Sequence, residues 1–317
     1  MIRRPAYRSL PFLTVLFTLA LLLAGCATPQ MASLQKRWPD ELPTSAKVER
    51  VPFYPQEDYH CGPASMAMAA SGAGVNLQPE DVLDKVYLPA RKGSLQVEMF
   101  AAGRHFGLLS YRLKPNMKAL LQEVAAGNPV IVLQNLSFPI SPVWHYAVVT
   151  GFDRERNTLT LHSGRTRDME MSLYAFERTW ERADHWAILV LPPTKIPATA
   201  DVASYASAVM AMELVAPAAA HSAYMTGLRK WPGHPTLLLG AGNTAYALGR
   251  LDVALYAYRE MTRQYPANAD GWNNMAQTLL DMGKLDEAGM AIERAVTLGG
   301  ERLPRYLELR KEIHAKH

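Results

Sequence analysis

The spacing of hydrophobic positions divides the chain into two parts. From Glu49 to Leu191, helical patterns alternate with short apolar runs bounded by turn residues, and the chain then becomes wholly helical and alanine-rich. The patterns predict helices at 61–71, 95–105, 117–126 and 173–181, and strands at 130–134, 145–152, 158–162 and 186–191. Helices that come first and a mostly antiparallel sheet that follows predict an α+β fold for this part.

A repeat organises the helical part. At a period of 34 residues Gly249 aligns with Gly283, Leu251 with Leu285, Ala254 with Ala288 and Pro232 with Pro266. The pattern resembles tetratricopeptide repeats, in which small residues let two antiparallel helices close. The match is strong for 235–268 and 269–302 and weak for 201–234, and 303–317 would be a cap helix. A helical bundle without a true repeat is the alternative. A stack of such repeats has a concave groove, which implies a protein or peptide partner.

The N-terminal segment has the pattern of a targeting signal. Its basic residues, Arg3, Arg4 and Arg8, precede an apolar stretch at 12–24 that is too short and too close to the terminus for an ordinary membrane span. The next residues, Leu23-Ala24-Gly25-Cys26, resemble the bacterial lipobox. That resemblance implies a lipoprotein signal peptide at 1–25 and a lipid on Cys26. The alternative is cleavage at another small residue, which would leave Cys26 as a plain thiol.

The lipobox also bears on location and organisation. Because Ala27, and not an aspartate, follows Cys26, we expect an outer-membrane lipoprotein that faces the periplasm of a bacterial cell envelope. We expect residues 26–47, which show no sustained periodicity, to be a tether. A domain at 48–193 follows, then a proline-bearing linker at 194–200, then the helical repeats at 201–317.

The charge of the chain excludes several functions. The formal net charge is +4, and removal of residues 1–25, which hold three arginines and no acids, lowers it to +1. The mature chain is therefore nearly neutral, and the sequence has no glycine loop suited to a phosphate. We therefore expect the chain to bind no nucleic acid or nucleotide and to use no metal or cofactor.

A cysteine at a helix start is the main chemical signal. If Cys26 carries lipid, Cys61 is left without a disulfide partner in an oxidising compartment. The partial positive charge of a helix N-terminus would lower the pKa of this thiol, and Gly62 would allow a substrate to approach the backbone closely. The alternative for Cys61 is a buried core thiol.

Two further residues could complete a catalytic site. His145 opens an apolar strand, and its imidazole could accept and return the thiol proton. The backbone N–H of Cys61 and the side-chain amide of Gln56 could donate hydrogen bonds to a developing oxyanion. The alternatives are a core histidine and a polar loop residue.

These residues carry a family resemblance. Gln56, Cys61-Gly62-Pro63 and His145-Tyr146-Ala147-Val148-Val149 resemble the papain-like leader peptidases fused to bacteriocin-exporting transporters, and their stand-alone relatives. The resemblance spans about Glu49 to Pro193. It implies a papain-like cysteine peptidase in which Cys61 attacks, His145 acts as base and Gln56 lines the oxyanion hole. The transmembrane and nucleotide-binding domains of the exporters find no match in this chain, so transport is not implied.

The family places an aspartate or asparagine about 16 to 17 residues after the histidine, where this chain has Thr160-Leu161-His162-Ser163-Gly164. His162 fits the orienting position best, although it could equally be an exposed histidine at a strand end. A histidine lacks the carboxylate charge, so we expect a slower enzyme. Asp153 lies at the far end of the strand and is too distant, whereas Asp168 stays open.

The sequence therefore predicts a membrane-anchored cysteine peptidase that hydrolyses peptide bonds through a thioester acyl-enzyme, with repeats that recruit a protein partner or substrate. Two alternatives stay open. One is a non-catalytic lipoprotein that binds peptides and scaffolds a complex, and the other is a cysteine amidase or acyltransferase.

Overall fold

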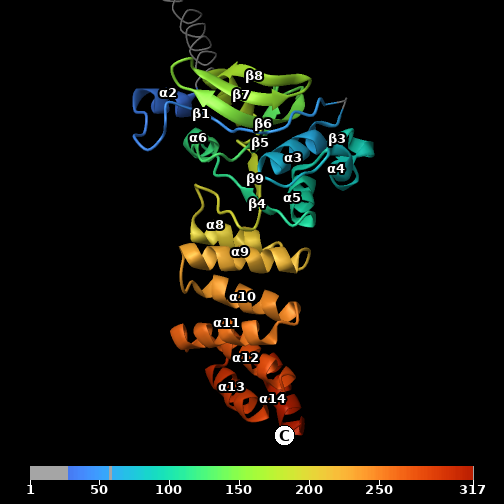
Figure 1. Ribbon diagram of the computed structural model, residues 1–317, viewed down its shortest axis with the longest axis vertical. Helices are drawn as coiled ribbons and strands as arrows, with labels where there is room; N and C mark the ends of the chain where they lie inside the picture. The colour runs from blue at the N-terminus through green and yellow to red at the C-terminus, as the bar shows by residue number, and fades with distance from the viewer. Residues whose placement is uncertain (1–27, 57–58, 317) are drawn as a thin grey trace, which may run out of the picture.

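The computed structural model describes residues 28–56 and 59–316. A mixed domain of helices and sheet comes first, and a column of helices leads away from it to the C-terminus (Figure 1). Cys26 and the segment 1–25 lie outside the described residues, so the signal peptide and the lipid stay predictions. Among the described helices, none has the length and apolarity needed to cross a membrane.

An antiparallel sheet forms the centre of the first domain. Over the described residues it has seven strands, ordered β4-β9-β5-β6-β7-β8, with β1 beside β6. The strands are β1 (Ser45–Lys47), β4 (Leu109–Arg112), β5 (Val130–Asn135), β6 (Trp144–Asp153), β7 (Thr158–Ser163), β8 (Thr166–Ser172) and β9 (Ala187–Leu191). A small hairpin of β2 (Tyr87–Leu88) and β3 (Gly93–Ser94) stands apart from this sheet. The α+β fold class is confirmed.

Helices pack around this sheet. They are α2 (Pro29–Lys36), α3 (Cys61–Gly72), α4 (Pro79–Val86), α5 (Gln96–His105), α6 (Met117–Ala125) and α7 (Leu173–Glu181), with a short 3-10 helix η1 (Pro89–Arg91). Residues 62–70 of α3 are all buried. A helix that is apolar all round belongs in a core, so α3 holds its N-terminal residue, Cys61, in a fixed position.

The tether prediction is wrong for the described part of that segment. Residues 29–36 form α2, and Met31 is fully buried. The carboxylate of Glu177 accepts hydrogen bonds from the backbone N–H groups of Gln30 at 2.9 Å and Met31 at 2.7 Å. β1 then pairs with β6. The segment escaped prediction because its order depends on this remote carboxylate and on the edge of β6.

The C-terminal helices pair as the repeat predicts. The strong repeats are α10 (Pro235–Ala247) with α11 (Leu251–Gln264), and α12 (Ala269–Asp281) with α13 (Leu285–Leu298). The weak repeat is α8 (Val202–Met210) with α9 (Pro217–Lys230), and α14 (Leu303–Lys316) is the cap. Close helix packing depends on missing side chains: the rings of Tyr224 and Tyr258 occupy the space that a Cβ would need at Gly240 and Gly242.

The linker prediction needs a correction, because no break in the core occurs at 194–200. One hydrophobic core runs from the sheet into the first helical pair and ends near Ala241, and a second core begins at Ala245. Glu123, buried on α6, accepts hydrogen bonds from the backbone N–H groups of Ala198 at 3.1 Å and Thr199 at 2.7 Å. The first helical pair is thus continuous with the sheet domain.

Candidate functional site

A cavity of about 960 Å³ lies between the start of α3, the start of β6 and the β2–β3 hairpin. Three residues predicted from the sequence, Cys61, His145 and Gln56, line it together. Residues up to 89 positions apart in the chain therefore share one cleft. The cleft is large enough for several residues of an extended peptide.

Cys61 is the first residue of α3, and its thiol is partly accessible. Burial raises the pKa of the Cys61 thiol, while backbone hydrogen-bonding groups of Tyr146, Gly62 and Cys61 itself act in the opposite direction. Since burial is the largest cause, the helix N-terminus does not produce a resting thiolate. The direction of this shift is opposite to the depression expected from a helix N-terminus.

The role expected for Gly62 also changes. A Cβ on Gly62 would lie 2.2 Å from Ser94 Oγ, so the missing side chain makes room for β3. Ser94 lines the cavity, and its carbonyl accepts a hydrogen bond from the Tyr146 hydroxyl at 3.3 Å. Gly62 therefore allows the cleft wall, and not a substrate, to approach the helix.

His145 is held by a residue that the sequence did not single out. Its Nε2 lies 2.9 Å from Ser163 Oγ, at the end of the neighbouring strand β7. Burial lowers the pKa of the His145 imidazole, which favours the neutral ring. In the tautomer that donates from Nε2 to Ser163, Nδ1 is left as the proton acceptor.

The Cys61 thiol interacts with the backbone of Tyr146, the residue that directly follows His145 in the chain. Over the residues that the structure describes, no hydrogen bond joins Cys61 to His145. Hydrogen bonds between catalytic groups are often long in an unliganded site and shorten when substrate binds. The directions of both pKa shifts favour a neutral thiol and a neutral imidazole as the resting pair.

The prediction that His162 orients His145 is wrong. His162 pairs with Val148 and Val149 pairs with Leu161, so His162 and His145 point to opposite faces of the sheet. His162 Nε2 donates to the Val51 carbonyl at 3.3 Å, and its Nδ1 accepts from the backbone N–H of Asp168 at 3.3 Å. Both ring nitrogens have partners away from the cleft, and burial lowers the pKa of this imidazole.

Neither Asp168 nor Asp153 takes the place of His162 as the residue that orients His145. The Asp168 carboxylate lies 3.6 Å from Lys47 Nζ and 3.9 Å from His162 Nδ1, on the far side from His145. Asp153 ends β6, the strand that Trp144 begins, so the sequence-based exclusion of Asp153 agrees with the structure.

Ser163 was present in the sequence window, and the strand period could have identified it. Side chains two residues apart share a face, so the pairing of Val149 with Leu161 puts His145 and Ser163 on the same face. The pairing register itself was not available from the sequence, because a β-bulge lies between Val149 and Gly151.

Gln56 is anchored by the β7–β8 turn. Its backbone N–H donates to the Gly164 carbonyl at 3.0 Å, and its Oε1 accepts from the Gly164 N–H at 3.1 Å. Its Nε2 lies 3.4 Å from both Ser65 Oγ and the Tyr146 carbonyl. These two bonds are long, so the amide can turn its hydrogens toward a stronger acceptor in the cleft.

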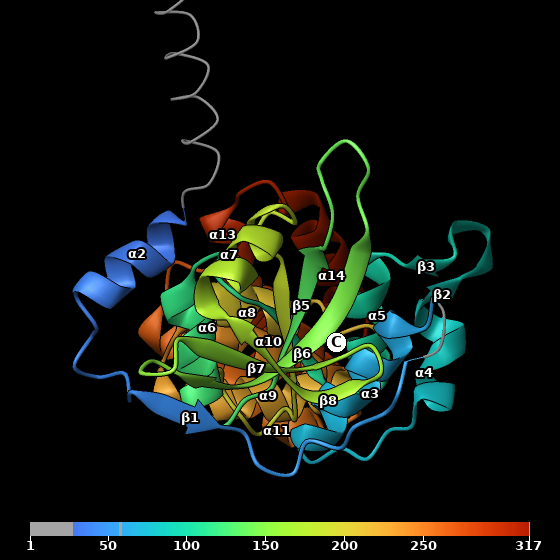
Figure 2. The same cartoon turned by 90° about the horizontal axis from the view of Figure 1, so that it is seen from above.

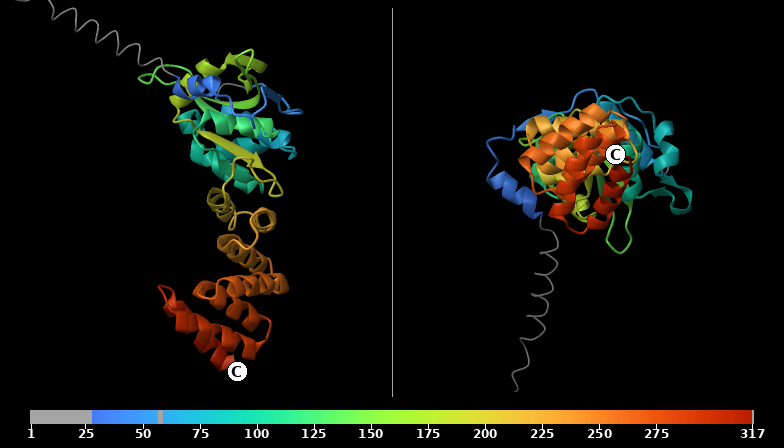
Figure 3. Two further views of the ribbon diagram at one scale, coloured as in Figure 1. Left: turned by 90° about the vertical axis from the view of Figure 1, so that its left-hand side faces the viewer. Right: turned by 90° about the horizontal axis from the view of Figure 1, so that it is seen from below.

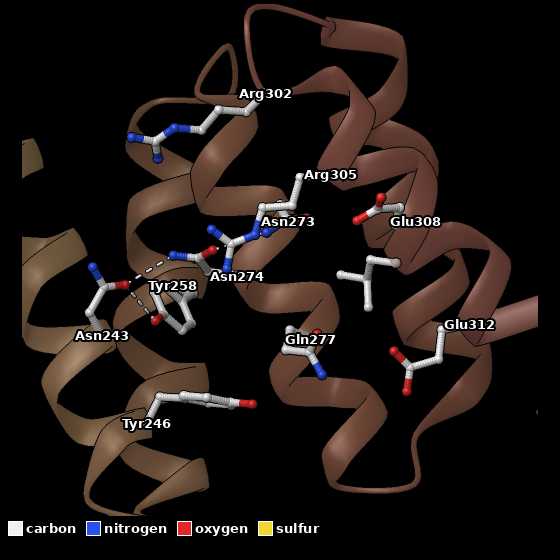
Figure 4. Close-up of a pocket in the computed structure, with 11 residues that line it drawn as sticks. Asn243, Tyr246, Tyr258, Asn273, Asn274, Gln277, Arg302, Arg305, Glu308 and Glu312 are labelled. Carbon is white, nitrogen blue, oxygen red and sulfur yellow. Dashed lines mark hydrogen bonds between the residues drawn. The ribbon is translucent and has the colours of Figure 1, made fainter.

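A second cavity, of about 470 Å³, lies among the repeat helices (Figure 4). Asn243 Oδ1 accepts hydrogen bonds from the Tyr258 hydroxyl at 2.8 Å and from Asn274 Nδ2 at 2.9 Å. Charged side chains of α14, Arg305 and Glu308 among them, project from the opposite wall (Figure 4). Amide and charged groups of this kind suit the polar backbone of a peptide. Neither here nor in the rest of the described chain could a group of three or more His, Cys, Asp or Glu hold a metal ion.

Comparison with known families agrees with this geometry. Residues 48–188 match the model of the peptidase C39 like family. The chain carries a C39-like peptidase domain. Residues 257–289 match the tetratricopeptide repeat model, so the C39-like domain is fused to helical repeats. Both family resemblances found in the sequence are confirmed. A search of curated proteins finds no match to the chain.

Solved structures match one part of the chain or the other. A C39-like peptidase from Bacillus anthracis is 16% identical, covers 49% of this chain and 100% of its own, and has a TM-score of 0.39. The peptidase domain of Streptococcus ComA, a bifunctional ABC transporter, is 22% identical, covers 45% of this chain and 99% of its own, and has a TM-score of 0.36. The Sgt2 tetratricopeptide repeat domain from Aspergillus fumigatus is 22% identical, covers 36% of this chain and 76% of its own, and has a TM-score of 0.32.

Proposed function

We propose that this protein is a lipid-anchored cysteine peptidase of the bacterial cell envelope, attached through Cys26 to the outer membrane and facing the periplasm. The observation that carries the proposal is the shared cavity of Cys61, His145 and Gln56, together with the Ser163 hydroxyl, whose Oγ lies 2.9 Å from His145 Nε2. In this proposal Cys61 is the nucleophile and His145 the base. Ser163 orients the base and Gln56 donates to the oxyanion, so the site meets the needs of acyl transfer.

The neutral thiol and imidazole define the first chemical step. As Cys61 Sγ attacks the carbonyl carbon of the scissile peptide bond, the thiol proton passes to Nδ1 of His145. The hydrogen bond from Nε2 to Ser163 keeps the ring in the tautomer that can accept it. Gln56 Nε2 and the Cys61 backbone N–H donate to the developing oxyanion.

Breakdown of this intermediate completes the reaction. The C–N bond breaks, His145 returns its proton to the departing amine, and a thioester on Cys61 remains. His145 then takes a proton from water, the hydroxide adds to the thioester carbonyl, and release of the carboxylic acid restores the thiol. Ser163 brings no charge to stabilise imidazolium, so we expect turnover slower than a carboxylate-supported site would give.

The repeats supply a second binding surface in this proposal. The amide and charged side chains of the second cavity would hold a protein partner, or a substrate protein that the peptidase cleft then cleaves. A deletion that removes α14, which supplies one wall of this cavity, should lower capture of a native protein substrate more than cleavage of a short peptide.

A second candidate function is a non-catalytic peptide-binding lipoprotein. The burial that raises the thiol pKa favours it, as does the lack of a carboxylate hydrogen-bonded to His145 among residues 28–56 and 59–316. The three-residue constellation around the cleft favours the peptidase. An amidase or acyltransferase would use the same nucleophile on a different acyl group.

One experiment separates these functions. Peptides from a bacterial envelope proteome are incubated with the chain and with its Cys61→Ala variant, and new termini are identified by mass spectrometry. We expect termini that depend on Cys61 and carry ¹⁸O when the water is labelled. Binding of peptides by both forms without new termini would support the scaffold, and new amide or ester products would support acyl transfer.

A further inference from the structure

An apolar loop projects from the peptidase domain. The chain between β5 and β6, residues 136–143, extends beyond the sheet (Figure 2). Phe138 and Ile140 at its tip are 70% and 96% exposed, and Leu136, Val143 and Trp144 near its base are about half exposed. No charged residue occurs from Asn135 to Trp144. A contiguous exposed apolar surface of this kind marks an interaction site.

The loop is braced from within the protein. Asn135 Oδ1 accepts hydrogen bonds from the backbone N–H groups of Ser137 and Val143, both at 3.0 Å. The Arg182 guanidinium donates to the Ser137 carbonyl at 2.8 Å. Two backbone bonds cross the loop, from Leu136 N to the Val143 carbonyl and from Ser141 N to the Phe138 carbonyl.

This bracing suits an apolar surrounding. Pro139 and Pro142 have no N–H, and the bonds just described satisfy most of the remaining donors of the loop. A backbone group left without a partner is costly in lipid. The loop therefore presents apolar side chains on a backbone that is hydrogen-bonded at its base and between Phe138 and Ser141.

The start of the described chain lies on the same side of the molecule as this loop (Figure 3). Both are held by α7 or the residue that follows it: Glu177 on α7 binds the backbone N–H of Met31, and Arg182, directly after the helix, binds the loop. Five residues of helix span about 8 Å. The loop and the N-terminal end of α2 are thus each tied to one end of the same short segment, residues 177–182.

Cys26 is two residues before Thr28, which is buried against the domain. Two residues reach at most about 7 Å. A lipid on Cys26 would therefore hold this side of the domain against the headgroups, because α2 begins at Pro29 and is fixed to the domain by the buried Met31.

We propose that loop 136–143 inserts Phe138 and Ile140 into the lipid interface beside the Cys26 anchor. The orientation of the loop relative to the anchor rests on the proposed function. Trp144 at the base of the loop, which also lines the mouth of the Cys61 cavity, would sit at headgroup level, where tryptophan is enriched. The peptidase domain is then fixed in orientation on the membrane by two contacts, and not suspended from it.

Vesicle flotation tests the loop without the lipid. The chain from Thr28 onward contains every packed element described, so it can be used without Cys26. It is mixed with vesicles of phosphatidylethanolamine and phosphatidylglycerol and compared with a Phe138→Ser, Ile140→Ser double variant. We expect a partition coefficient at least about tenfold lower for the variant, since burial of a side chain of this size is worth roughly that factor.

A control pair has the same chemistry elsewhere. Val97 and Leu214 are 63% and 99% exposed and lie outside the loop, and a Val97→Ser, Leu214→Ser variant should float like the unaltered chain. No flotation of the unaltered chain, or equal partition of the loop variant and the control pair, would overturn the proposal. So would a loop variant that floats normally but loses self-association or peptide turnover, because the loop would then serve a second copy or the substrate.

The anchor is tested separately on the full chain, by the mass of the N-terminal peptide from the membrane fraction and by a Cys26→Ser variant. An unmodified Cys26 would overturn the anchor alone. The flotation result of the chain from Thr28 would still decide the loop.

Discussion

At the scale of single residues, Ser163 and not His162 decides how His145 is held. A serine hydroxyl can fix the imidazole tautomer by accepting from Nε2, yet it carries no charge to balance the imidazolium that forms during attack. His162 is buried on the other face of the sheet with both ring nitrogens bonded. The two neighbours therefore have separable roles, one in the site and one in the fold.

Substitution of these neighbours should give different kinetic results. Ser163→Ala should lower kcat by about tenfold or more with little change in KM, because the ring loses its orienting partner but not its basicity. His162→Gln should leave kcat nearly unchanged and lower the free energy of unfolding, since a buried imidazole with two partners is lost. Steady-state peptide hydrolysis and urea denaturation check both variants. A larger kcat effect at His162 than at Ser163 would restore the original assignment.

The pH dependence follows from burial at Cys61 and His145. Because burial raises the pKa of the Cys61 thiol, its alkylation by iodoacetamide should increase with pH and level off only above the ordinary thiol range. Because burial lowers the pKa of His145, the base stays neutral to below pH 6.5, and kcat/KM should fall only as the pH drops through that lowered value. In the chain from Thr28, Cys61 is the sole thiol. Rapid alkylation at pH 6 would contradict the neutral pair.

At the scale of elements, the sequence predicted those helices and strands whose order comes from their own pattern. α3, α7 and β6 were found within a residue or two, since α3 and β6 are long and apolar and α7 is clearly amphipathic. α2, β1 and β8 were missed because their order comes from remote partners: a Glu177 carboxylate, the edge of β6 and the turn after Ser163. Cys61, His145 and Gln56 could be predicted from their chemistry and motif, whereas Ser163 needed the bulged register of β6.

The attachment of α2 can be tested at its anchoring carboxylate. Glu177→Gln removes the charge that binds the first N–H groups of α2, which should destabilise the segment by about 1–3 kcal/mol. Trypsin should then cut faster after Lys36 and Arg37 at the end of α2. Glu181→Gln, at an exposed position on the same helix, is the control. Equal cutting of both variants would mean that Glu177 does not hold α2.

At the scale of the whole molecule, the boundary between the two cores lies inside the helical region. The first core includes Leu237 on α10 together with the sheet, and the second includes Ile292 on α13. The first helical pair is therefore part of the peptidase domain in energetic terms, and the later repeats form the projecting part (Figure 1). A partner on the later repeats would be held away from the sheet.

Two matched truncations test this boundary. Leu237→Ala and Ile292→Ala each remove a fully buried side chain and should cost about 2–5 kcal/mol. Leu237→Ala should reduce hydrogen-exchange protection of β9 in the sheet, and Ile292→Ala should reduce it only from α11 to α14. Loss of β9 protection in both variants to the same degree would show one cooperative core.

The central claim is that His145 and Ser163 make Cys61 a catalytic nucleophile. The most direct measurement is the rate at which a peptidyl acyloxymethyl ketone modifies Cys61, divided by the rate for iodoacetamide, which reports thiolate alone. This ratio should fall about 100-fold in His145→Ala and about tenfold in Ser163→Ala, because the peptidyl reagent requires the aligned site. A ratio that is the same in His145→Ala as in the unaltered chain would contradict the account.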